Sequence, residues 1–269
     1  MKLQGKTVIL TGACGGIGAC IAEELATAGA RLLLVGREQQ ALERLRATLS
    51  GGPQDHMIYV ANLREEEGRA GLSKACSDAQ VDILINNAGL GEFNLLEHSS
   101  SDTIASVLDL NLNVPIQLTR LLLPILKARP AAAIINIGSA LGSIGYPGYS
   151  VYGASKFGLR GFSEALRREL SDSSVRVMHF APRATRTSLN DTKVLAMNTA
   201  LGTAMDAPEL VAKALCRRIQ SDRWKASVFG WPERLYALLN ALNPAITDGA
   251  IAKQLPEIKR FATELSQPK

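Results

Sequence analysis

The chain has 269 residues, of which 46% are hydrophobic and 20% are charged, and its formal net charge at pH 7 is +5. This composition is too apolar for a disordered polymer and too weakly basic for a dedicated nucleic-acid-binding protein. A chain of this length buries about three-quarters of its unfolded surface, so it needs neither disulfides nor a metal to fold. The length suits two domains or one large α/β domain.

The spacing of the cysteines and the lengths of the apolar runs indicate the cellular compartment. Cys14, Cys20, Cys76 and Cys216 form no CxxC pair and have no histidine-rich partner segment, which argues against a zinc site and for a reducing compartment. The longest apolar runs fall well short of the roughly 18 residues of a spanning helix. The N-terminal apolar run is also too short for a signal peptide. We therefore expect a cytoplasmic protein with no transmembrane segment.

Short apolar runs alternate with longer amphipathic segments over most of the chain. The expected strands span 6–10, 31–35, 56–61, 81–86, 132–138, 174–180 and 226–229. The expected helices span 17–29, 38–49, 64–79, 101–128, 150–171 and 208–220. This alternation predicts an α/β fold with a doubly wound parallel sheet of about seven strands and helices on both faces. The carboxyl ends of the strands then share one edge, where such sheets bind ligands.

Two segments interrupt the alternation. Residues 183–206 are rich in Thr, Asn, Ser and Ala, contain no clear strand, and are expected to form a mobile flap over the ligand edge. Residues 231–269 form a C-terminal appendage, whose apolar positions predict two short helices divided at Pro244. No linker precedes the appendage, so we expect it to pack on the same domain as residues 1–230, which include the flap.

A glycine-rich segment, Thr11–Gly18, connects the first expected strand to the first expected helix. Gly12, Gly16 and Gly18 allow a tight turn and a close backbone approach, and the free amides and dipole at the helix start favour a pyrophosphate. The segment therefore predicts a dinucleotide site, although its spacing departs from GxGxxG. The alternative is a glycine-rich turn that binds nothing.

The end of the second strand indicates the choice of nucleotide. It carries no carboxylate to hold a ribose 2′-hydroxyl, and Arg37 follows it. A guanidinium can pair with a 2′-phosphate, which favours NADP over NAD; the alternative is a solvated arginine at a helix start. Asn62, after the third strand, can bond the adenine edge or can simply belong to a turn.

Three further residues can perform acid–base chemistry. Tyr152 and Lys156 are four residues apart, so in a helix the ammonium lies beside the phenol and lowers its pKa. Thirteen residues upstream of the tyrosine, Ser139 ends a buried strand, where its hydroxyl can bond a substrate carbonyl or cap the next element. Asn111 is an unfavourable residue inside the expected helix 101–128, where it or Asn113 can also face solvent.

These motifs together resemble the short-chain dehydrogenase/reductase family over roughly residues 4–230. Thr11–Gly18 resembles the TGxxxGxG loop, Asn86–Gly89 resembles the NNAG strand end, and Ser139, Tyr152 and Lys156 are similar to the catalytic triad. The resemblance implies a Rossmann-like fold and likewise a homodimer or homotetramer. It implies that Tyr152 is the general acid/base, that Lys156 lowers its pKa and holds the nicotinamide ribose, that Ser139 polarises the substrate oxygen, and that Asn111 holds a water in a proton relay.

On this basis we expect a set of cofactor contacts along the strand ends. The set comprises Gly12, Cys14, Gly15, Gly16, Ile17, Gly18, Arg37, Asn62, Leu63, Asn87, Ala88, Gly89, Tyr152, Lys156, Thr185 and Thr187. The family usually has glycine where this chain has Arg183, and a basic residue within the glycine loop, where this chain has none. Arg183 can face an anionic substrate or solvent.

The expected function is an NADP(H)-dependent interconversion of a ketone and a secondary alcohol. The expected pocket is apolar and is lined by Phe93, Leu141, Ile144, Ser188, Leu189, Leu195 and Met197. The three histidines are too scattered to bind a metal. Two alternatives remain open: a catalytically silent nucleotide-binding sensor or scaffold, and a membrane-surface reductase of lipids, which the apolar appendage suggests.

Overall fold

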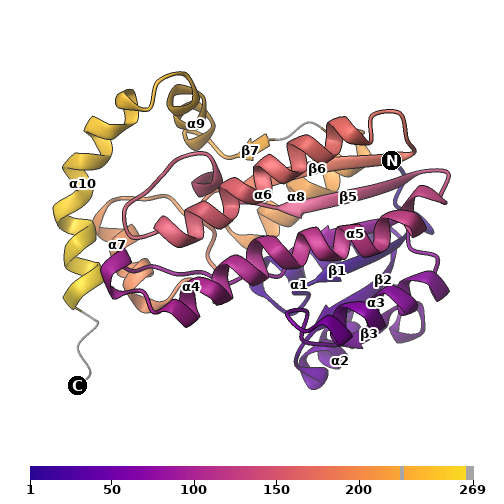
Figure 1. The fold of residues 1–269 in the computed structure, drawn as a ribbon. Coiled ribbons are helices and arrows are strands. Elements are labelled where there is room, and N and C mark those ends of the chain that lie inside the picture. The colour runs from indigo at the N-terminus through magenta and orange to yellow at the C-terminus, as the bar shows by residue number, and fades with distance from the viewer. Residues whose placement is uncertain (225–226, 265–269) are drawn as a thin grey trace.

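The computed structural model describes residues 1–224 and 227–264, which form one twisted parallel sheet covered by helices (Figure 1). Within these residues the sheet has seven strands in the order β3-β2-β1-β4-β5-β6-β7. The chain winds outward from β1 to β3, crosses back to β4, and winds outward again to β7. The expected doubly wound α/β fold is confirmed.

The strand bounds follow the apolar runs closely. They are β1 (Thr7–Thr11), β2 (Arg31–Gly36), β3 (Met57–Val60), β4 (Ile83–Asn86), β5 (Ala132–Ile137), β6 (Val175–Pro182) and β7 (Ser227–Phe229). All neighbouring strands pair in parallel. Residue 226, the first of the last expected strand, lies outside the described residues.

The helices alternate with the strands and then continue beyond the sheet. They are α1 (Gly16–Thr27), α2 (Gln39–Thr48), α3 (Glu66–Asp78), α4 (Ser101–Leu108), α5 (Val114–Lys127), α6 (Ser150–Glu169), α7 (Thr192–Ala200), α8 (Pro208–Gln220), α9 (Glu233–Leu242) and α10 (Ala245–Glu264).

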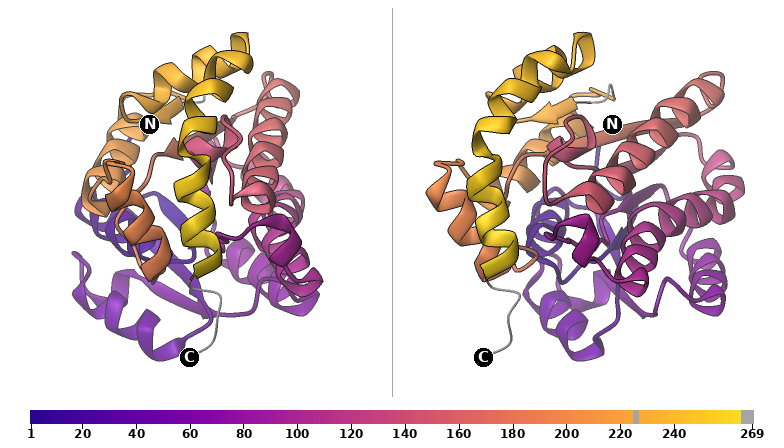
Figure 2. Two further views of the ribbon diagram at one scale, coloured as in Figure 1. Left: turned by 90° about the vertical axis from the view of Figure 1, so that its left-hand side faces the viewer. Right: turned by 60° about the vertical axis from the view of Figure 1, so that its left-hand side comes forward.

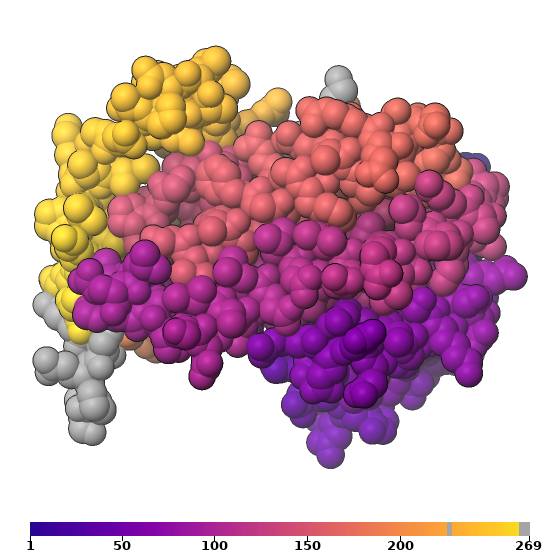
Figure 3. All heavy atoms as spheres, in the orientation of Figure 1, coloured from indigo at the N-terminus to yellow at the C-terminus, as the bar shows by residue number. Residues whose placement is uncertain are grey.

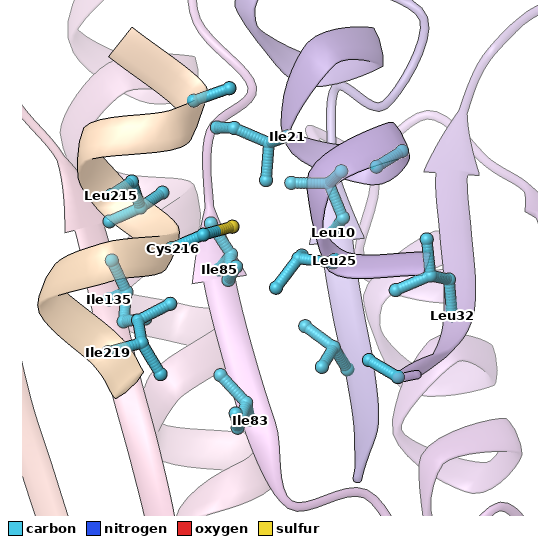
Figure 4. Close-up of a cluster of buried hydrophobic side chains, with 14 of the residues drawn as sticks. Leu10, Ile21, Leu25, Leu32, Ile83, Ile85, Ile135, Leu215, Cys216 and Ile219 are labelled. Atoms are coloured by element: carbon cyan, nitrogen blue, oxygen red, sulfur yellow. The ribbon is translucent and has the colours of Figure 1, made fainter. Parts of the chain in front are cut away.

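The strands are apolar on both faces because each face has its own core. In β1, Val8 and Leu10 belong to one buried cluster and Ile9 belongs to the other, as the period of two requires. The first cluster packs α1 and α8 on the sheet, and Figure 4 shows Ile21 and Leu25 of α1 facing the α8 side chains. The second packs α3, α5 and α6 on the opposite face. This double cover fixes the strand ends that carry the site.

Three expected elements differ in the structure. The expected helix 101–128 contains a π-helical turn, Asp109–Asn113, between α4 and α5. The expected flap 183–206 contains helix α7, whose Val194 and Met197 are buried. The sequence of α7 is only weakly amphipathic, so this helix was not predicted. Its buried side chains pack against α10 and the loop after β4 rather than on the sheet. The second appendage helix, α10, has 20 residues and is not short.

The appendage lies at the carboxyl edge of the sheet. Figure 2 shows α10 running from α9 across this end of the molecule, beside α7, and Figure 3 shows α9 as a protruding knob. Leu238 and Leu242 of α9 are exposed, so the apolar stripe of this helix is only partly covered. No helix in the described ranges combines the length and apolarity that crossing a bilayer requires. The tail 265–269 of the expected appendage lies outside the described residues.

Candidate active site

A cavity of about 690 Å³ opens at the carboxyl edge of the sheet. Thirteen of the residues that the sequence predicts for the site line it: Gly12, Gly15, Gly16, Ile17, Gly18, Asn87, Ala88, Gly89, Ser139, Tyr152, Lys156, Thr185 and Thr187. The predicted residues Cys14, Arg37, Asn62, Leu63 and Asn111 do not line it. Among the expected apolar wall residues, only Leu195 lies outside the cavity lining. The carboxyl edge of the sheet thus brings together residues as far apart as Gly12 and Thr187.

The glycine loop is shaped by backbone contacts that exclude side chains. Gly12 has a φ of +63°, and a Cβ there would lie 2.7 Å from the Cα of Ala88. A Cβ at Gly18 would collide with the carbonyl oxygen of Gly12. Helix α1 begins at Gly16 without a side-chain cap and without an acidic residue in its first turn. The positive end of α1 therefore faces the cavity with free amides, as an anion site requires.

Thr11 and Asn87 hold this loop against β4. The Thr11 hydroxyl accepts hydrogen bonds from the amides of Asn87 and Ala88, both at 3.0 Å. The Asn87 side-chain amide donates to the carbonyl oxygens of Thr11 and Gly12, at 3.1 and 3.0 Å. The Asn87 side chain therefore positions the loop. Sequence reasoning gave Thr11 no role of its own, although a threonine that ends a buried strand was a signal.

Ser139, Tyr152 and Lys156 meet at one point of the cavity wall. The Tyr152 and Ser139 side chains both line the cavity, and Ser139 lies close enough to the phenol to lower its pKa. The Lys156 ammonium lies 5.7 Å from the centre of the Tyr152 ring and donates to the carbonyl oxygen of Ile137 at 3.0 Å. Ser139 also caps the short turn that follows it by accepting from the Leu141 amide at 3.2 Å. The expected i, i+4 geometry of tyrosine and lysine is present, and Ser139 is both a cap and a neighbour of the phenol.

Burial dominates the protonation of this pair. It raises the pKa of Tyr152, and the nearby Ser139 side chain only partly opposes this rise. The lowering of this pKa by Lys156 stays a prediction, because burial sets the net direction in this structure. Burial lowers the pKa of Lys156 to about 8. The phenol is thus protonated at neutral pH. The neighbouring amine titrates close to neutral pH.

Asn111 lies in the π-helical turn and is fully buried. Its side-chain oxygen accepts from the Leu90 amide at 2.7 Å, and its nitrogen donates to the Leu90 carbonyl at 2.9 Å and to the Ser155 hydroxyl at 3.1 Å. Ser155 in turn donates to the carbonyl oxygen of Tyr152 at 2.6 Å. The asparagine that is unfavourable in a helix therefore fastens the loop after β4 to the start of α6.

The residues predicted to contact the adenosine half of the cofactor have different surroundings. Arg37 follows β2, is exposed, and makes no hydrogen bond or ion pair within the described ranges. The Asn62 side chain bonds Glu65 at 2.8 Å and the Arg64 amide at 3.2 Å, which is turn chemistry. Leu63 is a buried core residue, and Cys14 is exposed. Of this group, Arg37 is free to bind an anion.

Arg183 lines the cavity, but its guanidinium is engaged by groups of the protein itself. Its guanidinium donates to both carboxylate oxygens of Asp206, at 2.9 and 2.7 Å, and to the carbonyl oxygen of Trp231 at 2.7 Å. Glu233 lies 3.4 Å away, and the arginine side chain is only 17% exposed. These carboxylates raise the pKa of Arg183 above its usual value. The residue that replaces the usual glycine is a clamp that joins β6, the end of the flap and the start of α9.

Thr185 and Thr187 carry the flap across the glycine loop. Thr185 donates to the Arg183 carbonyl oxygen at 2.9 Å and pairs through its backbone with Asp206. A Cβ at Gly16 would lie 2.8 Å from the Cβ of Thr187, so this threonine packs directly on the start of α1. The flap therefore adjoins both the anion site and the clamp.

Sequence reasoning missed part of the cavity wall. Tyr149 stacks edge-on against Tyr152 with ring centres 6.0 Å apart, and Phe93 lies 5.1 Å from Tyr149. Aromatic residues at intervals of three before Tyr152 were a usable signal for this wall. Within residues 1–224 and 227–264, no three His, Cys, Asp or Glu side chains are placed to hold a metal ion together.

Comparisons with known proteins agree with this geometry. A family model described as short chain dehydrogenase matches residues 6–198. Nodulation protein G of Rhizobium sp. (strain N33) is 36% identical over 222 residues, which are 78% of this chain and 89% of that protein. Ketoacyl reductase HetN of Nostoc sp. is 33% identical over 81% of this chain and 77% of that protein.

Solved structures show the same fold at lower identity. A short-chain dehydrogenase/reductase from Burkholderia phymatum in complex with NAD has a TM-score of 0.80 at 23% identity, covering 92% of this chain and 96% of that one. A short-chain dehydrogenase from Burkholderia cenocepacia in complex with NADP has a TM-score of 0.79 at 23% identity, covering 93% and 99%. The family model spans well over half of this chain, which therefore belongs to the short-chain dehydrogenase/reductase family of oxidoreductases.

Proposed function

We propose that the protein is an NADP(H)-dependent oxidoreductase that interconverts a ketone and a secondary alcohol on a largely apolar substrate. The supporting observation is the meeting of Ser139, Tyr152 and Lys156 in a cavity whose other end is the glycine loop. A relative named a ketoacyl reductase supports a carbonyl substrate.

The glycine loop fits a dinucleotide. Gly12 and Gly18 allow the loop to pack tightly on its own backbone and on Ala88, and the uncapped start of α1 offers its amides to a pyrophosphate. The fold neighbours include one complex with NAD and one with NADP. Arg37 supports NADP, because an exposed guanidinium without a partner can pair with a 2′-phosphate.

The protein's own groups provide and direct the proton. A reduced nicotinamide, when bound, supplies a hydride to a carbonyl carbon. Tyr152, whose pKa is raised by burial, is protonated at neutral pH and donates its proton to the carbonyl oxygen. The Ser139 hydroxyl donates a hydrogen bond to the same oxygen. Lys156, with a pKa of about 8, can return a proton to the phenol near neutral pH.

The variant Tyr152→Phe tests this proposal. It removes the proton donor and keeps the ring, so we expect NADPH-dependent ketone reduction to fall at least about a thousandfold. NADPH binding, measured by NADPH fluorescence, should change by less than about threefold. The matched control is Tyr59→Phe in β3, which makes the same chemical change away from the cavity and should leave reduction intact. Substantial reductase activity in Tyr152→Phe would contradict the proposal.

The organisation of the chain is part of the same proposal. We propose one domain that includes the flap and the appendage, because the Arg183 clamp joins both to β6. We also propose a reducing, cytoplasmic location, which four free cysteines support. A homodimer or homotetramer is proposed, with α4, α5 and α6 as the contact face.

A further inference from the structure

The cavity extends beyond Tyr152 into a part that we call the distal chamber. It is lined by Phe93, Tyr149 and Met197 and also by Leu239 of α9 and Ile251 of α10. The family model ends at residue 198, so helices α9 and α10 lie outside it. The distal chamber is therefore built in part by a segment that the family pattern does not describe.

The α10 wall is fixed in place from both ends. The Tyr146 hydroxyl donates to the Gln254 side-chain oxygen at 2.7 Å, which ties the middle of α10 to the loop before α6. Further along α10, Ile258 and Ala262 are fully buried against the cluster that contains Phe93 and Met197. Figure 2 shows α10 lying across this end of the molecule. The wall is thus a packed helix with a defined position.

Four polar side chains near the distal chamber already have partners. Thr247 donates to the Asn240 side-chain oxygen at 2.7 Å, and Asn240 donates to the Ser143 carbonyl oxygen at 3.0 Å. Glu233 pairs with Arg183, and Asp191 caps α7 by accepting from the Val194 amide at 2.9 Å. A negatively charged substrate would find no free cation among these groups, because Arg183 is already paired, and its desolvation would be uncompensated.

The distal chamber opens between α9 and α10. Tyr236 and Ile246 line the cavity and are also 48% and 51% exposed, so they mark its mouth. Both are largely apolar, and the neighbouring Leu242 of α9 is exposed as well. The path from Tyr152 to the surface is therefore lined by apolar side chains together with polar groups such as Thr247 and Gln254.

We propose that the distal chamber binds the hydrocarbon chain of an elongated, uncharged ketone. The carbonyl group lies at Tyr152 and Ser139, and the chain runs past Met197 and Ile251 towards Tyr236 and Ile246. This assignment rests on the proposed ketone reduction and names the substrate class for the same site.

A homologous series of straight-chain 2-alkanones, from four to twelve carbons, tests the assignment with NADPH as reductant. Each methylene buried in the chamber should raise kcat/KM about two- to fourfold. The rise should stop once the chain reaches the mouth. A flat series from four carbons upward would overturn the assignment.

Two matched tryptophan variants locate the effect. Ile251→Trp fills the distal chamber, and we expect it to lower the ratio of kcat/KM for 2-decanone over 2-butanone at least about tenfold. Leu242→Trp makes a similar change at an exposed position outside the cavity and should keep the ratio within about twofold. Should Ile251→Trp fail to fold by circular dichroism, Ile246→Glu at the exposed mouth should lower the same ratio. Equal ratios in the chamber variant and in Leu242→Trp would overturn the assignment.

A binding measurement separates this inference from the proposed function. Saturation-transfer NMR of the same 2-alkanones on Tyr152→Phe with NADPH reads chain binding without turnover. Chain-length-dependent binding that is lost in the chamber variant supports the assignment even if no alkanone is reduced, an outcome that would count against the proposed function alone. Reduction of 2-butanone with no chain-length dependence in either measurement supports the proposed function. It overturns the assignment of the distal chamber to a hydrocarbon chain.

Discussion

The glycine loop and the appendage meet at one cavity, yet they are held by different means. At the loop, backbone atoms approach so closely that Gly12 and Gly18 admit no Cβ. At the appendage, side chains make the joints, through Arg183 to Asp206 and Tyr146 to Gln254. Backbone packing fixes one geometry, whereas side-chain joints can be exchanged residue by residue. Under the proposed function, the nucleotide would therefore be bound by the rigid region and the substrate by the exchangeable one.

The sharpest test of this contrast makes the same glycine-to-alanine substitution once in each region. Gly18→Ala puts a methyl group on the Gly12 carbonyl oxygen, so we expect the NADPH dissociation constant to rise at least about a hundredfold and the protein to lose about 2 kcal/mol of stability. Gly249→Ala, in α10, meets no atom within 4 Å and should add up to about 1 kcal/mol, because alanine favours helix. Fluorescence titration and urea unfolding measure both. Similar losses in the two variants would remove the contrast.

Breaking the clamp should change substrate use more than cofactor use. Arg183→Ala leaves Asp206 and Glu233 without their cation, and we expect a loss of about 2 kcal/mol in the free energy of unfolding. The KM for long ketones should rise about tenfold, and the NADPH dissociation constant should change less than threefold. Arg183→Lys keeps the charge but not the bidentate geometry. Its stability and its KM should therefore lie between those of the wild type and of Arg183→Ala. An unchanged KM would show that the clamp does not set the substrate site.

Removing the Arg37 guanidinium should weaken the binding of NADPH but not that of NADH. Arg37→Ala should weaken NADPH binding about tenfold, because one phosphate contact is lost, and should leave NADH binding within twofold. Arg167→Ala, an exposed arginine of α6, serves as the control. Equal effects of Arg37→Ala on both nucleotides would contradict the NADP preference.

The smallest effect concerns the buried amine. Burial lowers the pKa of Lys156 from 10.5 to about 8, so the unfolded chain binds more protons than the folded one between these values. Stability from this group is present above pH 10.5 and is lost as the pH falls through 8. Relative to Lys156→Met, the wild type should gain on the order of 1 kcal/mol between pH 8 and 9.5 in urea unfolding without added cofactor. Parallel pH profiles of the two proteins would refute the burial effect.

The parts of the site that sequence reasoning predicted depend on local spacing. The apolar runs placed the strands, and the interval between Tyr152 and Lys156 placed both side chains on one turn of α6. Glycines 12, 16 and 18 marked the loop because each sits at a fixed offset from β1. Such features need only the period of a helix or strand and the shared edge of a parallel sheet.

The parts that sequence reasoning missed depend on long-range partners. Arg183 meets Asp206 after 23 residues and Trp231 after 48, and no local pattern predicts either pairing. Tyr146 meets Gln254 across 108 residues. The raised pKa of Tyr152 comes from burial, which the sequence does not display. Helix α7 was missed because its partners lie in α10.

The Arg183 clamp also places a natural optical reporter. The chain contains two tryptophans, Trp224 and Trp231, and they flank β7, with the carbonyl oxygen of the second held by the guanidinium. In the variant Trp224→Phe, emission comes from Trp231 alone. Its wavelength and quenching would then report on the contact that Arg183 makes at the start of α9, so release of the clamp can be followed by stopped flow without an added dye.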